Sequence, residues 1–177
     1  MKTTSRIFAV LAALLISVAA WADRTAGEHI DDSAVQAEVK AKLMGDDFFG
    51  GAGANIEIHK GVVQLGGWVD SAEEAAKAGE IAAAVDGVVE VDNQLHVKRG
   101  EASMGQVVDD KVITTRTKSA IGELDLGTGF DVNVDTYNGV VLLTGFVHSA
   151  ETRAACGELA AQVDNVEDVV NGIYVYE

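Results

Sequence analysis

The chain has 177 residues, with 28 acidic and 13 basic side chains, a formal net charge of −15, one cysteine and no proline. A surface this acidic disfavours nucleic acid and anionic membranes as long-range electrostatic partners, and a single cysteine excludes an intrachain disulfide. The hydrophobic fraction of 48% is sufficient for a packed core.

Residues 1–22 have the pattern of a secretory signal peptide. Lys2 and Arg6 give a basic start, the stretch 7–20 is almost wholly apolar, and Ala20-Trp21-Ala22 is a small-x-small cleavage site. The alternative is a retained anchor, but about 14 apolar residues fall short of the roughly 20 that span a bilayer. We therefore expect cleavage between Ala22 and Asp23, and a periplasmic mature chain without a transmembrane span. Its 11 basic and 28 acidic side chains give a net charge of −17.

The rest of the chain is a repeat. Residues 61–73 read GVVQLGGWVDSAE and return 78 residues later, at 139–151, as GVVLLTGFVHSAE. At this offset residues 31–99 align with 109–177 without a gap, and 26 of the 69 positions are identical. Such self-similarity indicates two copies of one module. We expect a polar lead-in at 23–30, a first module at 31–99, a linker at 100–108 and a second module at 109–177.

Each copy predicts a helix followed by a hairpin. Val35, Val39 and Leu43 recur at helical spacing after Asp31-Asp32, and a matching stripe follows Asp109-Asp110. Two alternating strands come next, joined by a two-residue turn that contains Gly61 in the first copy and Gly139 in the second. The second turn, Asn-Gly, is the strongest short hairpin signal because both residues tolerate positive φ.

The second half of each copy, after the second strand of the hairpin, predicts a helix and a last strand. Gly67 and Gly145 fall inside the second strand, where a glycine indicates a bulge or the close approach of another backbone. Ser71 and Ser149 begin the second helix as N-caps, with Glu74 completing a capping box in the first copy. The predicted fold class is α+β, with two tandem α-β-β-α-β modules. Each is a three-stranded mixed sheet with two helices on one face.

This order, the repeated GVV-L-G-V-SA-E core and the Val-Asp-Gly-Val-x-x-Val-x-Asn ending at 85–93 resemble the BON domain. Two such domains behind a signal peptide resemble the osmotically inducible periplasmic proteins of the OsmY type. The resemblance implies a periplasmic, stress-linked, non-enzymatic protein, and it suggests phospholipid binding at the cell envelope or chaperone-like activity. The acidic charge departs from what an anionic-lipid binder would carry.

Strand alternation leaves one face of each sheet without a helix. In the second module this face is almost wholly apolar. The candidate contact residues for a partner or lipid on the two faces are Trp68, Leu142, Phe146, Tyr174 and Tyr176. The alternatives are docking against the other module or a second chain, or a site for lipid tails or apolar client segments.

Lys111, Arg116 and Lys118 lie on the first helix of the second module and are candidates for contact with anionic lipid. A solvated helix face is the alternative. The four histidines lack the spacing of a helical zinc motif, and no group of residues indicates a nucleophile, a general acid or base, or a cofactor site. Cys156 shares a helical stripe with apolar residues and is predicted to be a core residue.

From the sequence we expect a non-enzymatic periplasmic envelope-maintenance protein that acts by binding. The first hypothesis is a chaperone-like or protein-interaction role through the uncovered sheet face, with unidentified envelope proteins as partners. The alternative is peripheral phospholipid binding. The glycines at 61, 67, 139 and 145 are expected to serve turns and packing. The sequence leaves the oligomeric state open.

Overall fold

The computed structural model describes residues 31–45, 54–126 and 130–176. The predicted signal peptide, its cleavage site at Ala22–Asp23 and the lead-in at 23–30 lie outside the described residues. The first module contains α1 (Asp32–Gly45), β1 (Asn55–His59), β2 (Val62–Val69), α2 (Ala72–Ala83) and β3 (Glu90–Val97). The second contains α3 (Met104–Ile121), β4 (Val132–Tyr137), β5 (Val140–Val147), α4 (Ala150–Ala161), β6 (Asp168–Asn171) and β7 (Tyr174–Val175).

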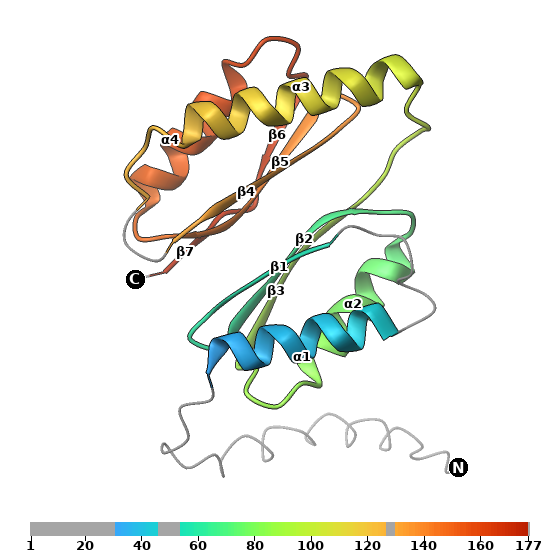
Figure 1. The fold of residues 1–177 in the computed structure, drawn as a ribbon, viewed down its shortest axis with the longest axis vertical. Coiled ribbons are helices and arrows are strands. Elements are labelled where there is room, and N and C mark those ends of the chain that lie inside the picture. Colours follow the sequence, from blue (N-terminus) through green and yellow to red (C-terminus); the bar gives the residue numbers. More distant parts are fainter. Residues whose placement is uncertain (1–30, 46–53, 127–129, 177) are drawn as a thin grey trace, which may run out of the picture.

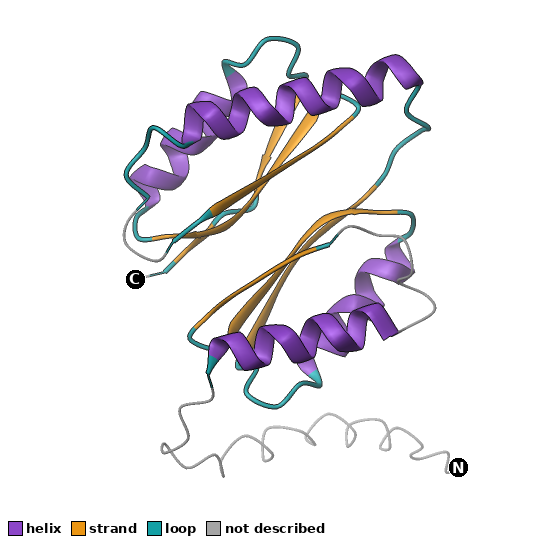
Figure 2. Ribbon diagram, viewed as in Figure 1, coloured by secondary structure: helices purple, strands orange, loops and turns teal. Residues whose placement is uncertain are grey.

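Each module has a mixed sheet built around its second strand. β2 pairs antiparallel with β1 and parallel with β3, and β5 pairs antiparallel with β4 and parallel with β6 and β7. The helices lie on the outer side of each sheet (Figures 1 and 2). The predicted α+β fold class is confirmed, with one difference. The last strand of the second module is divided into β6 and β7 around Gly172, whose amide still donates to Leu143 O at 2.9 Å.

Both hairpins turn through two residues of positive φ, as the sequence predicts. Lys60 and Gly61 have φ of 48° and 80°, and Asn138 and Gly139 have φ of 49° and 78°. An acidic residue on the first helix of each module supports the turn of that module. The Asp32 carboxylate accepts from the amides of residues 60 and 61 at 2.6 and 3.0 Å, and Asp110 accepts from 138 and 139 at 2.8 Å each.

The helix starts are set by serine caps. The Ser71 and Ser149 hydroxyls each accept a hydrogen bond from the backbone amide three residues later, at 3.1 Å in both modules. Glu74 reaches the Asp70 amide at 2.9 Å rather than that of Ser71. α3 begins at Met104, five residues before the expected start at Asp109, because Ser103 forms a complete capping box with Gln106. The S-x-x-Q pattern was the available signal for this start.

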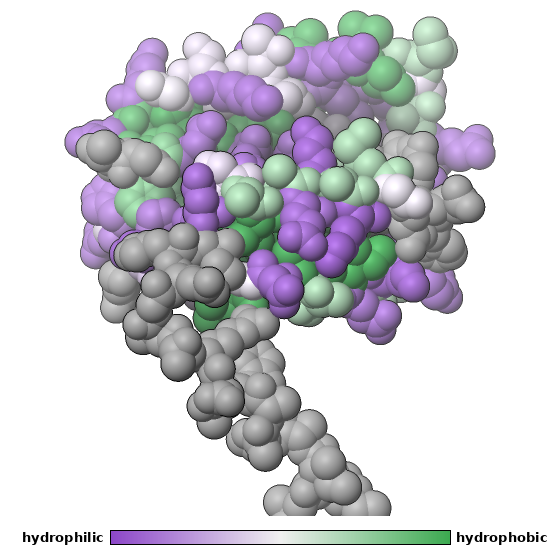
Figure 3. Space-filling model, turned by 60° about the horizontal axis from the view of Figure 1, so that its bottom comes forward, coloured by the Kyte–Doolittle hydropathy of each residue, from purple (hydrophilic) through white to green (hydrophobic). Residues whose placement is uncertain are grey.

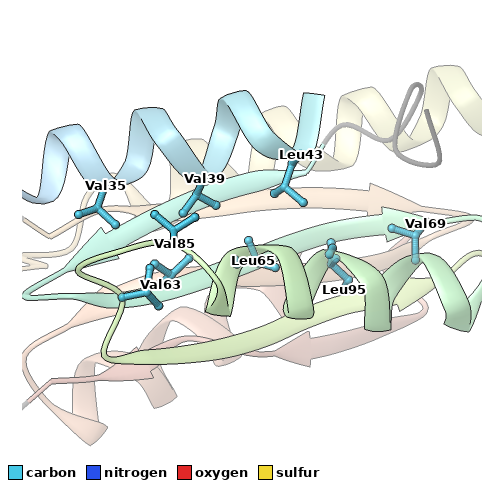
Figure 4. Close-up of a cluster of buried hydrophobic side chains, with 11 residues drawn as sticks. Val35, Val39, Leu43, Val63, Leu65, Val69, Val85 and Leu95 are labelled. Atoms are coloured by element: carbon cyan, nitrogen blue, oxygen red, sulfur yellow. The ribbon is translucent and has the colours of Figure 1, made fainter. Parts of the chain in front are cut away.

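Each module has its own apolar core between sheet and helices. In the first, Val35, Val39 and Leu43 of α1 point onto Leu65 and its neighbours on the sheet (Figure 4). In the second, Cys156 is fully buried among the equivalent residues, as predicted, and burial raises the pKa of its thiol. Two separate cores mean that each sheet is stabilised from one side by its own helices.

An asparagine on the last strand joins that strand to the second helix. Asn93 Nδ2 donates to Ala75 O at 2.7 Å, and the pair 78 residues later, Asn171 and Arg153, repeats the bond at 2.8 Å. A Cβ on Gly79 would lie 2.9 Å from the side-chain Nδ2 of Asn93, so a glycine at this position leaves room for the Asn93 side chain. This contact gives a structural role to the asparagine that closes the repeated motif.

Candidate functional site

The sheet faces without helices face each other (Figure 1). The structure therefore has four layers: helices, sheet, sheet and helices. β2 and β5 contact each other across the centre. Of the alternatives for this face, docking against the other module is the one observed, because each module covers the face of the other. The hypothesis of a binding site on an uncovered face is therefore wrong. Leu142 and Phe146, both candidate contact residues, are only 1% and 4% exposed.

The interface has approximate two-fold symmetry, since contacts recur between residues offset by 78. Trp68 packs against Tyr137 in a tilted arrangement with ring centroids 5.6 Å apart, and the equivalent pair, Phe146 and His59, lies at 5.8 Å. A residue on such an axis faces its own equivalent. The equivalent of Gly66 is Thr144, 78 residues later, and a Cβ built on Gly66 would lie 2.6 Å from the Thr144 hydroxyl. The modules meet as the two halves of an isologous dimer would.

The centre of the interface is polar at one point. Gln64 is 1% exposed, and its Nε2 donates to Gly172 O at 2.8 Å and to Asp92 Oδ2 at 2.6 Å. Its Oε1 accepts from the Gly145 amide. The equivalent residue of the second module is Leu142. One side chain therefore satisfies two buried backbone groups of the opposite module.

Two carboxylate–amide pairs flank this centre. Asn133 Nδ2 donates to Glu57 Oε1 at 3.0 Å, and Asn55 Nδ2 donates to Asp135 Oδ2. Desolvation by burial raises the pKa of Asp135, although Lys118 and the Asn55 hydrogen bond act in the opposite direction. The Asp135 carboxylate is therefore an unfavourable charge within the interface at neutral pH.

A pH-dependent effect follows for Asp135→Asn. Because the pKa is raised in the folded protein, the protonated carboxyl favours folding. Its contribution is present below about pH 4, the pKa of an unfolded aspartate, and is lost as pH rises through the folded-state value. The asparagine keeps an acceptor for Asn55 and carries no charge. We expect the Tm of the variant, relative to wild type, to rise between pH 4 and pH 7.

Thermal denaturation followed by circular dichroism at several pH values measures this difference. Glu158→Gln removes an exposed carboxylate of α4 and serves as the control, with a Tm difference that stays flat over the same range. A difference for Asp135→Asn that falls as pH rises contradicts the assignment.

The remaining candidate aromatics form the rim of the interface. Tyr174 packs against Phe146 of its own module in a tilted arrangement with ring centroids 5.5 Å apart. Tyr176 makes an edge contact with His59 at 4.6 Å, and Lys60 Nζ lies 4.7 Å from the Tyr176 ring centroid. Both tyrosines are half-buried. The structure thus brings all five predicted contact residues to one interface, where Trp68, Phe146 and Tyr176 make ring contacts with the other module.

The predicted basic residues do not form a patch. Arg116 is paired with Asp164 at 3.3 Å, and Lys118 faces Asp135 closely enough to affect its pKa. Lys111 is exposed on α3. Two of the three cations are therefore already beside carboxylates of their own module.

A shallow cleft of about 430 Å³ opens at one edge of the interface, beside Asp92, Arg153 and Tyr174. Its polar groups are already bonded within the protein. Asp92 accepts from Gln64 and Gln94, and Arg153 Nη2 donates to Asn171 O at 2.9 Å. These groups favour a structural role for the cleft over recognition of a small molecule.

Apart from the separate residues Met44, Val89 and Val97, the exposed large apolar side chains of the described residues form a group on α3. It comprises four residues at helical spacing, with exposed fractions of 39–86%: Met104, Val107, Val108 and Val112. The opposite side of α3 is buried against the sheet through Ile113, Thr117 and Ile121. We call the four exposed residues the α3 stripe. The stripe was not predicted, because residues 100–108 are expected from the repeat to be a linker, although the apolar spacing at 104, 108 and 112 is visible in the sequence.

The face of the molecule that Figure 3 shows is mixed in hydropathy. On the side turned forward in Figure 3, hydrophilic residues are spread over most of the described surface, with small hydrophobic areas between them. Among residues 31–45, 54–126 and 130–176, no helix combines the length and apolar character needed to cross a bilayer. The same residues contain no cluster of three or more potential metal ligands.

Comparison with known proteins gives the family. The BON domain model matches residues 31–99 and 109–176. The chain is 33% identical over 148 residues to osmotically-inducible protein Y of Escherichia coli K12, covering 83% of this chain and 74% of that protein. It is 31% identical over 148 residues to the outer membrane lipoprotein DolP of Haemophilus influenzae, covering 83% and 76%. It is 32% identical over 152 residues to a 21 kDa hemolysin of Actinobacillus pleuropneumoniae, covering 85% and 77%.

Proposed function

Because the chain belongs to the BON domain family, we propose that it is a non-enzymatic envelope protein that acts by binding. The names of two relatives refer to osmotic induction and to the outer membrane. The predicted signal peptide supports a periplasmic location. A role in envelope maintenance under osmotic or similar stress agrees with both.

The α3 stripe is the surface that we propose for binding, and phospholipid is the ligand. One observation supports this most directly: the side chains of Met104 and Val108 are 86% and 59% exposed on a helix that buries its opposite face. A helix with an apolar side next to a lysine is suited to lie in the interface of a membrane. The sheet faces are covered by each other, so a chaperone-like role there is not part of this proposal.

Apolar insertion has to provide most of the affinity. Each basic residue near an anionic membrane contributes about 1 kcal/mol, and Lys111 is the one predicted cation without a carboxylate partner in the described structure. The net charge of −17 for residues 23–177 acts against anionic lipid. We therefore expect vesicle binding that persists at high salt and does not require anionic lipid, in contrast to binding through Lys111, Arg116 and Lys118.

The test is co-sedimentation of residues 23–177 with neutral and with anionic phospholipid vesicles, at low and high salt. Replacing Met104, Val108 and Val112 together with serine removes three buried contacts from the bound state. We expect the affinity to fall at least about tenfold, since even 1.4 kcal/mol in total gives this factor. Circular dichroism should show that α3 stays helical.

Met44→Ser provides the control, because Met44 is 74% exposed on α1 and lies outside the α3 stripe. Its binding should equal that of wild type. Failure of the wild-type chain to bind any vesicle would reject the lipid proposal. The α3 stripe would then be examined as a surface for a partner protein, the second candidate.

A further inference from the structure

We propose that the interface between the two modules is a salt-sensitive latch, closed at high ionic strength and open at low ionic strength. The inference rests on charge and packing at the interface and is independent of the α3 stripe, which lies on the outer side of the second module.

Both modules are strongly acidic. Residues 31–99 contain 6 basic and 13 acidic side chains, and residues 109–177 contain 4 and 12, so the net charges are −7 and −8. Closing the latch brings two strongly acidic modules together. The Debye length is about 30 Å at 10 mM salt and about 3 Å at 1 M, so this repulsion acts across a whole module at low salt and is nearly absent at high salt.

The carboxylates at the interface are accommodated by side-chain amides. Glu57 is bonded to Asn133 and Asp135 to Asn55, each across the interface. Asp92 is bonded to the amides of Gln64 and Gln94. An amide donor satisfies a carboxylate oxygen without neutralising its charge. The nearby cations are Lys118, on the same module as Asp135, and Lys60, over the Tyr176 ring. Arg153 lines the same cleft as Asp92, and its Nη2 donates to Asn171 O.

Opposing forces of different salt dependence make the equilibrium adjustable. The apolar contacts of Leu142 and Phe146 favour the closed form and are not screened by salt. The repulsion among the carboxylates favours the open form and is screened. Raising the salt concentration therefore weakens only the opening force.

The connection between the modules allows such a motion. Gly100 has a φ of 74°, and nothing lies within 4 Å of the position of a Cβ there. The linker is held to the second module by exposed hydrogen bonds, from the Tyr137 hydroxyl to Gly100 O at 2.5 Å and from Asn138 Nδ2 to Arg99 O at 3.1 Å. Each module keeps its own core when these bonds break. Opening would expose the sheet face that carries Phe146 and Tyr174.

The test is small-angle X-ray scattering on residues 23–177 at 10 mM and 500 mM NaCl. We expect a larger radius of gyration at 10 mM for wild type. The double variant Glu57→Gln and Asp135→Asn removes one interface charge from each module and should stay compact at both concentrations.

The matched control is Glu73→Gln with Glu151→Gln. These exposed residues begin α2 and α4, lie 78 apart, and also remove one charge from each module. The control should open at low salt as wild type does. The proposal is overturned if wild type has the same radius at both concentrations, or if the interface variant responds to salt as the control does. Neither result depends on vesicle binding.

Discussion

Replacing Gly145 with alanine is expected to lower the free energy of unfolding by about 2–4 kcal/mol, because backbone strain and a backbone clash act together. Gly145 has a φ of 118°, a conformation that L side chains rarely adopt. A Cβ at this position would also lie 2.1 Å from Asp131 O. That oxygen belongs to the backbone and accepts from the Phe146 amide at 3.2 Å, so it cannot move without loss of another bond.

Urea denaturation monitored by circular dichroism measures this loss. Gly105→Ala is the control, because Gly105 lies in the first turn of α3 with only the Ser103 hydroxyl near, at 3.9 Å from the added Cβ. An alanine there should be neutral or stabilise the chain by up to about 1 kcal/mol, since it lowers the entropy of the unfolded state. Equal stability of the two variants would contradict the role assigned to Gly145.

The glycine in β5 illustrates how far the sequence is informative. Its place inside a strand indicated a close approach by another backbone, and Asp131 is that backbone. The Asn138-Gly139 turn and the Ser149 cap were predictable for the same reason. Each depends on the conformational preferences of a few neighbouring residues, and these preferences act locally.

The partner of the apolar sheet face was not predictable in this way. Alternation along β5 places Phe146 on the side away from the helices, and it lies there. Alternation does not identify what covers that side, because the covering residues come from a module 78 positions away. The contact between Phe146 and His59 depends on the relative pose of two domains, which local periodicity does not encode.

The α3 stripe was missed for a different reason. The repeat aligned Asp109 with Asp31, so the helix was expected to begin at the same place in both copies. Ser103 and Gln106 extend the second copy toward its N-terminus, where the first has no described counterpart. A repeat therefore predicts what the modules share. Features that belong to one copy have to be sought in the residues that differ.

Gln64 is such a residue, and its replacement by leucine is expected to destabilise the chain by about 2 kcal/mol or more. The expectation is not obvious, because the equivalent residue is Leu142 and a buried leucine gains roughly 1.5–3 kcal/mol from the hydrophobic effect. Against this gain, the variant leaves Gly145 N and Gly172 O, both buried, without the partner that each has in the structure. A buried unsatisfied backbone group costs about 1–3 kcal/mol, so at mid-range two of them cost about 4 kcal/mol and outweigh a gain of about 2 kcal/mol.

Thermal and urea denaturation of Gln64→Leu, beside Gln94→Leu, tests this sign. Gln94 is half-buried and donates one hydrogen bond, to Asp92, so its replacement should cost less than about 1 kcal/mol. If Gln64→Leu were as stable as wild type, Gly145 N and Gly172 O would have to obtain other partners, and the interface would be held by apolar contacts alone. If it is less stable by the expected amount, one polar side chain distinguishes the two otherwise similar sheet faces and fixes how they meet.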